Sequence, residues 1–177
     1  MKPLVDAWRE ANPNIVGLWA DVEEAATQAI TTRAKINLHS LSFAVRSGIL
    51  FITLPSGRQL AYVQPSLGEN RWGGTSINHW GVGTGKKWQK LETYGGKLVE
   101  NIVQATARDL LTHSLKVLDA AGHRVVMHVH DEAVIEEPCT SSATVGNICE
   151  LMTTPPAWAS GLPLDADGYE CSFYKKD

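Results

Sequence analysis

An apolar segment interrupted by three polar residues constrains this chain more than any other feature. Residues 124–138 read RVVMHVHDEAVIEEP, in which two apolar runs flank a His-Asp-Glu triplet at 130–132. Every second residue of the first run is apolar, which is the period of a β-strand. The second run is short and β-branched. The sequence therefore predicts a hairpin that bends at the triplet, although Asn-Gly and Asp-Gly turn residues are absent.

The bend places two carboxylates, Asp131 and Glu132, side by side between apolar strands. Neighbouring carboxylates repel each other, and burial disfavours their charged forms. A divalent cation would keep both ionised, and hard oxygen ligands of this kind suit Mg²⁺ or Mn²⁺. The alternative is an ordinary surface turn, because most acidic turns are only solvated.

Composition indicates a globular chain. Its 177 residues suffice for one ordinary domain with a core, and 44% are hydrophobic against 20% charged. A net charge of −3 gives no support for a free-standing DNA-binding module or for binding to an anionic membrane. No apolar run approaches membrane-spanning length. Three widely spaced cysteines without a C-x-x-C motif predict reduced thiols and a cytoplasmic protein.

Periodicity and turn residues predict an ordered series of elements. Helices are expected at 4–11, 13–32, 93–121 and 140–152, and strands at 49–54, 59–63 and 169–174. Asn12 is expected to cap the second helix. Residues 34–47 are ambiguous. Residues 65–89, which contain Trp72, Trp80 and Trp88, are expected to form a long packed loop. Residues 81–87 superficially resemble a phosphate-binding loop but lack the Walker spacing, so that reading is rejected.

The helix expected at 93–121 carries a polar stripe. Lys97, Asn101, Gln104 and Arg108 follow one another at helical spacing. One interpretation is a solvated face. The other is a row of amide and guanidinium donors that faces a ligand, which suits contacts to bases and sugars.

Two segments carry a resemblance to a known family. QATARDL at 104–110, followed by VHDE at 129–132, resembles the C-terminal palm of the family A DNA polymerases, the DNA polymerase I family. TYGGKLVEN at 93–101, WREANP at 8–13 and LPL at 162–164 are similar to the phage and prophage branch. The resemblance covers nearly the whole chain, and residues 93–138 carry most of its specificity.

This resemblance implies an α+β fold, with an antiparallel palm-type sheet and a His-Asp-Glu hairpin packed against long helices. Residues 1–92 would be a remainder of the fingers or a palm insertion, with helices and a β-hairpin. Residues 93–177 would be the C-terminal half of the palm. The implied reaction is two-metal nucleotidyl transfer, with Mg²⁺ or Mn²⁺ as cofactor and primer-template DNA and a dNTP as partners.

The resemblance also implies roles for single residues. Asp131 matches one of two aspartates that hold the catalytic metal pair, and Glu132 matches the adjacent acid that assists there. His130 matches a histidine near the primer terminus. Gln104 matches a glutamine that touches the minor groove. The family usually has asparagine where this chain has Glu100, so Asn101 is the nearest equivalent, and Arg108 stands where many members have alanine.

Two family features are absent from the sequence. There is no Asp-Tyr-Ser or Asp-Phe-Ser motif for the second aspartate, and no helix with the lysine and aromatic residue that grip the nucleotide. We therefore expect a C-terminal piece that is inactive alone and needs an N-terminal polymerase portion as partner. Apolar surface left by the missing part would favour a homodimer.

Two other functions stay open at this point. A palm remnant could serve as a non-enzymatic binding or assembly module. A metal-dependent hydrolase could use His128, His130 and Asp131, since His-x-His on one strand face can chelate zinc. The hydrolase is disfavoured because catalytic zinc usually takes three protein ligands and no histidine follows the triplet.

Overall fold

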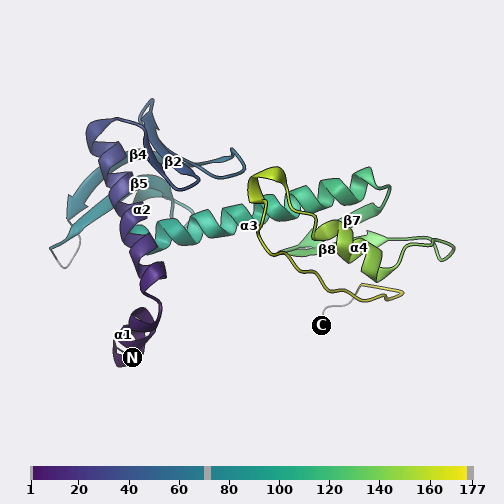
Figure 1. The fold of residues 1–177 in the computed structure, drawn as a ribbon. Helices are drawn as coiled ribbons and strands as arrows, with labels where there is room; N and C mark the ends of the chain where they lie inside the picture. The colour runs from purple at the N-terminus through teal and green to yellow at the C-terminus, as the bar shows by residue number, and fades with distance from the viewer. Residues whose placement is uncertain (1, 70–72, 175–177) are drawn as a thin grey trace. The chain divides into compact units, whose positions relative to one another are not determined.

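The computed structural model describes residues 2–69 and 73–174. It divides into two compact units, Met1–Ala105 and Thr106–Asp177. Figure 1 shows the fold and labels the helices α1 to α4 and some of the strands. Trp72, part of the predicted loop, lies outside the described residues. The family resemblance places a boundary at 92/93, between a remainder of the fingers or a palm insertion and the C-terminal half of the palm. This boundary stays a prediction.

Two helices begin the first unit. α1 spans Lys2–Ala11 and α2 spans Pro13–Thr32, close to the predicted bounds. Pro13 occupies the first turn of α2, where its missing N–H removes no helical hydrogen bond. Asn12 does not cap the helix as expected. Its side-chain amide instead donates to the Trp8 carbonyl at 2.8 Å, which ties the junction to the end of α1.

Six strands follow, and each pairs antiparallel with the next along the chain. The strands are β1 (Ile36–Leu38), β2 (Leu41–Arg46), β3 (Ile49–Thr53), β4 (Gln59–Glu69), β5 (Thr75–Val82) and β6 (Trp88–Thr93). The predicted strands at 49–54 and 59–63 correspond to β3 and the start of β4. The ambiguous segment forms β1 and β2.

The predicted loop at 65–89 is wrong over much of its length, because it contains the end of β4 and all of β5. Pro65 argued against a strand there, since proline cannot donate to a ladder. The β4–β5 register shifts between Val63 and Ser66, so Pro65 lies in a bulge where a ladder hydrogen bond is not required. Gln64 has φ +48° and donates its N–H to the Gly48 carbonyl at 2.8 Å. The bulge thus lets one strand continue through a proline.

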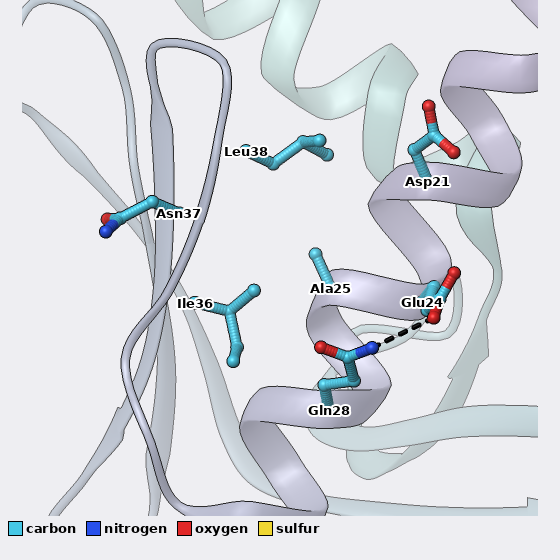
Figure 2. A pocket seen from close by; sticks show the side chains of 7 residues that line it. All are labelled: Asp21, Glu24, Ala25, Gln28, Ile36, Asn37 and Leu38. Carbon is cyan, nitrogen blue, oxygen red and sulfur yellow. Dashed lines mark hydrogen bonds between the residues drawn. The ribbon is translucent and has the colours of Figure 1, made fainter.

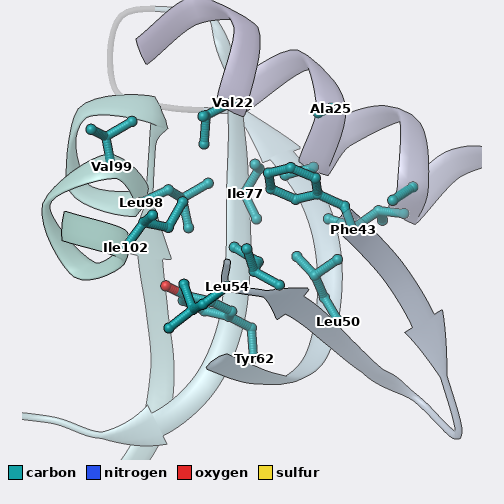
Figure 3. Packing of buried hydrophobic residues seen from close by; sticks show 14 residues of the cluster. Val22, Ala25, Phe43, Leu50, Leu54, Tyr62, Ile77, Leu98, Val99 and Ile102 are labelled. Carbon is teal, nitrogen blue, oxygen red and sulfur yellow. The ribbon is translucent and has the colours of Figure 1, made fainter. Parts of the chain in front are cut away.

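The core of the first unit lies between the sheet, α2 and the beginning of α3 (Gly95–Ala120), as Figure 3 shows. α2 contributes fully buried small residues at helical spacing. The sheet and α3 contribute larger ones. The fully buried apolar side chains of this core are Val22, Ala26 and Ala29 of α2, Phe43, Leu50, Ile52 and Ile77 of the sheet, Leu54 just after β3, and Leu98 of α3. Small residues on α2 let the helix approach the sheet closely, which fixes its position.

A glycine at the start of α3 permits contact with the backbone of α2. A Cβ atom built on Gly95 would lie 2.0 Å from the Trp19 carbonyl oxygen, far inside the closest approach of real Cβ atoms. The Gly95 N–H donates to the Glu23 carboxylate at 2.8 Å. A carboxylate at a helix N-terminus also meets the positive end of the helix dipole. Gly95 is therefore required by packing between α3 and α2.

The second unit contains the rest of α3, a hairpin and two short helices. These are β7 (Arg124–Val129), β8 (Glu132–Glu136), α4 (Val145–Met152) and the 3-10 helix η1 (Ala157–Ala159). β7 and β8 form their own two-stranded sheet. The Ser114 hydroxyl on α3 donates to the Met152 carbonyl at the end of α4 at 2.7 Å. Few side chains in this unit are fully buried, and Leu118 is the largest of them.

The chain is thus a mixed α and β protein with an antiparallel sheet, as expected at the level of fold class. The predicted strand at 169–174 is wrong, because those described residues form no strand. Tyr169, Phe173 and Tyr174 have exposed fractions of 43, 72 and 46%. A strand needs a neighbouring strand for its backbone hydrogen bonds, and no ladder is formed by residues 169–174 in the described structure. None of the described helices combines the length and apolarity needed to cross a membrane.

Candidate functional site

The His-Asp-Glu triplet lies at the turn between β7 and β8. Val129 pairs with Glu132, which leaves His130 and Asp131 as a two-residue turn. His130 has φ +53°. Tight hairpin turns require positive φ at their first central residue, and histidine is among the non-glycine residues that tolerate it. The turn therefore forms without the Asn-Gly or Asp-Gly signal that the sequence lacks.

The two carboxylates of the triplet have different surroundings. Asp131 is exposed at the turn, whereas Glu132 is half-buried at the first position of β8. Within residues 2–69 and 73–174, no three His, Cys, Asp or Glu side chains come close enough to hold a metal ion. Mg²⁺ prefers six oxygen ligands in octahedral geometry. Asp131 and Glu132 have suitable oxygens, but they fit only part of such a site, and water, phosphate or another polypeptide must supply the rest.

Arg108 of α3 contacts the hairpin through His128. Its two terminal nitrogens lie 3.2 Å from the two ring nitrogens of His128. A neutral imidazole has one acceptor nitrogen, so at most one of these contacts is a hydrogen bond. His128 pairs with Ala133 on β8 and is two residues from His130. The contact therefore joins α3 to the strand that leads into the turn.

The arrangement gives no support to the zinc hydrolase. That alternative required His128, His130 and Asp131 to act together with further ligands. The His128 ring is in contact with Arg108, a cation that disfavours a bound metal ion. Among the described residues no three His, Cys, Asp or Glu side chains come together to hold a metal ion, and this includes His128, His130 and Asp131.

In the first unit, the predicted DNA contact Asn101 belongs to a polar group that the sequence did not suggest. Its side-chain amide donates to the Tyr62 hydroxyl at 3.0 Å. Burial raises the pKa of Tyr62, and the Asn101 hydrogen bond opposes that rise. The Tyr62 and His79 rings meet edge-to-face, with centroids 5.0 Å apart. Burial lowers the pKa of His79, an effect that the Trp80 backbone opposes and the nearby Lys97 charge reinforces.

Two further polar residues of the first unit are Gln104, a predicted DNA contact, and Arg58. Gln104 is exposed on α3, which leaves its amide available to a ligand. Arg58, at the β3–β4 turn, donates from Nη2 to the Ala105 carbonyl of α3 at 2.6 Å. The sequence around Arg58 indicates only a basic residue at a hairpin tip. Its partner lies 47 residues away, and no local pattern signals such a contact.

A shallow pocket of about 210 Å³ lies between α2 and β1 (Figure 2). Asp21, Glu24 and Gln28 line it from α2, and Ile36 and Leu38 from the strand. The Gln28 amide donates to the Glu24 carboxylate at 2.9 Å, so part of its polar lining is already paired. The pocket contains none of the predicted site residues.

Comparison with known proteins gives one informative relative. The chain is 51% identical over 176 residues to the DNA polymerase of Bacillus phage SP02. It is similar to part of a phage DNA polymerase. The match covers 98% of this chain and 27% of that polymerase, so the chain spans about a quarter of its relative's length. No protein-family model matches the chain. No solved structure matches it either.

Proposed function

We propose that this chain is part of a template-directed DNA polymerase of the DNA polymerase I family. The supporting observation is the 51% identity to a phage DNA polymerase along nearly the whole chain, a span that includes both α3 and the β7–β8 hairpin. The motifs at 93–110 and 129–132 independently favour the same family. The chain would supply part of the palm, and other polymerase regions would supply the remainder of the active site.

In this proposal the turn carries one half of a two-metal centre. Two divalent cations in such a centre activate the primer hydroxyl and stabilise the leaving pyrophosphate. Asp131 would be a direct ligand, because it is exposed at the tip of the hairpin. Glu132 would assist from the first position of β8, and His130 would lie near the primer terminus. The left-handed backbone at His130 fixes how the turn presents these side chains.

The polar residues of α3 would contact the primer-template. Gln104 would donate to base edges in the minor groove. The donors and acceptors there differ little between base pairs, so shape dominates recognition. Asn101 would act beside Tyr62, whose hydroxyl holds its amide. Arg108 would contact DNA or position the hairpin through His128. A short primer-template and a dNTP are thus the expected partners.

Primer extension tests this proposal. The purified chain is assayed with Mg²⁺ and four dNTPs, alone and mixed with the part of the phage SP02 polymerase outside the matched region. We expect no extension alone, because no three metal-binding side chains come together among the described residues, and misplacing a catalytic group by about 1 Å costs about a hundredfold. We expect extension on mixing, lost in Asp131→Ala and retained in Asp167→Ala, an exposed acid away from the turn.

The outcomes separate the alternatives. Extension by the chain alone would contradict the view that it holds a partial site. Extension on mixing that survives Asp131→Ala would remove Asp131 from the reaction. No extension under either condition, with the polypeptides shown to associate, would favour a non-enzymatic binding or assembly module.

A further inference from the structure

The hairpin formed by β5 and β6 exposes two tryptophans. Trp80 and Trp88 have exposed fractions of 37 and 58%, and Val82, which pairs with Trp88, has 63%. The sequence predicted a long packed loop around these tryptophans, whereas both lie exposed on strands. The opposite face of the same hairpin buries Ile77 and Thr93 almost completely. The core of the first unit therefore does not need either tryptophan.

The register places the exposed residues together. Trp80 pairs with Lys90, and Val82 pairs with Trp88. Directly paired residues share a face of a sheet, and so do residues two apart on one strand. Trp80, Val82, Trp88 and Lys90 consequently form one exposed surface, here called the tryptophan–lysine face. The two indoles are diagonal neighbours across the strands, a separation of about 7–8 Å that is within reach of large side chains.

Two more lysines lie at the turn of this hairpin. Lys86 and Lys87 follow Gly83-Thr84-Gly85, and all three lysines of the hairpin are exposed. Glu92 is the sole acid among residues 79–93, in a chain with net charge −3. The hairpin is thus locally cationic while the chain as a whole is anionic.

The backbone at Lys86 is unusual for its residue type. Lys86 has φ +55°, and the turn is closed by hydrogen bonds from Lys86 N to Gly83 O at 2.9 Å and from Gly83 N to Lys87 O at 3.0 Å. This is the three-residue hairpin loop that ends in a left-handed position, which glycine ordinarily occupies. A lysine there is unfavourable for the fold. Residues held in such a conformation concentrate at functional positions.

We propose that the tryptophan–lysine face, with Lys86 and Lys87, binds single-stranded DNA. Unstacked bases would stack on the two indoles, and the lysines would contact phosphates. Aromatic platforms beside cationic side chains are the common solution for single strands, because every base has a face to stack while its backbone is anionic. A duplex keeps its bases stacked internally and would gain only the phosphate contacts. The inference concerns binding without metal or nucleotide, so it does not depend on Asp131.

The affinity of the full chain for single-stranded DNA tests the proposal. It is measured at low salt by fluorescence anisotropy of a labelled oligothymidylate of about 20 nucleotides. Each of Trp80→Ala and Trp88→Ala is expected to weaken binding on the order of tenfold, and Trp88→Phe by less, because a smaller ring still stacks. In Lys87→Gln, the slope of log affinity against log salt concentration is expected to become less negative by about 0.7, the value for one phosphate contact on a single strand. Thermal unfolding of each variant checks that the fold persists.

Lys86→Gly separates binding from folding. Glycine suits the left-handed backbone, so this variant is expected to unfold at the same or a higher temperature and yet to bind the oligonucleotide more weakly. Lys35→Gln, outside the surface, is the matched control and should leave affinity unchanged. It replaces a residue that is exposed elsewhere in the first unit.

Three results would overturn the proposal. The first is parental affinity in the double variant Trp80→Ala/Trp88→Ala. The second is equal affinity for the single strand and for a duplex of the same length, which would indicate phosphate contacts alone. The third is no binding of the oligonucleotide at low salt.

Discussion

At the scale of single residues, this protein depends on backbone positions that few residue types can occupy. Gly95 lets α3 begin against the Trp19 carbonyl. His130 takes a left-handed conformation at the turn that presents Asp131, and Lys86 does so in the β5–β6 turn. None of these requirements can be deduced from residue identity alone, since glycine and histidine occur in many other settings. Their polar neighbours are the Glu23 carboxylate at Gly95, Asp131 after His130 and Lys87 after Lys86.

Gly95→Ala is expected to destabilise the fold by about 1–3 kcal/mol, the usual cost of overpacking a close contact. The added methyl group would lie 2.0 Å from the Trp19 oxygen, so α2 or α3 must shift. Gly17→Ala is the matched control. Gly17 lies inside α2 with open space around it, so alanine there should stabilise by about 0.5–1 kcal/mol. Urea denaturation of both variants measures the difference, and two changes of the same sign would contradict this account of Gly95.

Asp131 is expected to bind Mn²⁺ or Mg²⁺ weakly, with a dissociation constant on the order of millimolar, because two carboxylates supply few of the oxygens these ions need. In an NMR titration, Mn²⁺ should broaden the amide signals around residues 129–133 first. Asp131→Ala should abolish that selectivity. Glu136→Ala, which removes an exposed acid from the same hairpin, should leave it intact. Tight stoichiometric binding would indicate a more complete site than the described residues contain.

At the scale of elements, the β7–β8 hairpin is held by side chains at both of its ends. Arg108 contacts His128 near the turn. At the open end, Glu137 accepts from the His123 ring at 2.7 Å and from the Ser141 hydroxyl at 2.8 Å. The neighbouring Arg124–Glu136 pair is short, but both side chains are more than half exposed. Exposed ion pairs contribute little to stability, so Glu137 rather than Glu136 should hold this end.

The stability of the hairpin end should depend on pH through Glu137. Hydrogen bonds from His123 and then Ser141 hold the Glu137 pKa below its ordinary value of 4.5. A carboxyl whose pKa is depressed on folding stabilises the fold above the unfolded pKa, and this contribution is lost as pH falls from 4.5 through the folded value. Glu137→Gln should therefore reduce the stability difference between pH 7 and pH 3. Thermal melts at the two pH values measure it, with Glu136→Gln as the control expected to match the parent. An equal pH response in Glu137→Gln and the parent would contradict the assignment.

At the scale of the whole molecule, burial is distributed unequally between the two units. The contiguous core of α2, the sheet and the start of α3 belongs to the first unit. β7 and β8 contain no fully buried residue and form a sheet of two strands. Two-stranded sheets are only marginally stable by themselves. The site proposed for catalysis therefore lies in the less stable part of the chain, as is common for functional segments.

Hydrogen exchange should reveal this inequality. Amides of β3, which carries the buried Leu50 and Ile52, are expected to exchange at least about tenfold more slowly than those of β8, because local opening requires less free energy where little apolar surface is buried. Mass spectrometry of peptides covering 49–53 and 132–136 measures both. Equal protection of the two peptides would mean that the chain unfolds as one cooperative unit.

Self-association is expected through α1. Leu4, Val5 and Trp8 of this helix have exposed fractions of 76, 46 and 45%, and contiguous apolar surface of this kind favours association. Sedimentation velocity should show concentration-dependent dimers, reduced in Leu4→Ser. Val82→Ser, at an apolar position outside α1 with an exposed fraction of 63%, is the control. A strict monomer at high concentration would contradict the expectation.

Short patterns along the chain predict the local elements and the class of protein to which this chain is similar. Helical spacing located α2 and α3 to within two residues, and the apolar runs around 130–132 located β7 and β8, because both depend on short periods along the chain. The motifs on α3 and the hairpin indicated a polymerase before any comparison. Their assigned roles remain predictions for experiment.

Tertiary structure alone decided the contacts between distant residues. Gly95 meets Glu23 across 72 residues, and Asn101 meets Tyr62 across 39. Local patterns likewise do not predict that a strand continues through Pro65 or that Trp80 and Trp88 are exposed. The physical reason is that register, bulges and burial depend on which surfaces meet, and side-chain preferences within a few residues do not encode that choice.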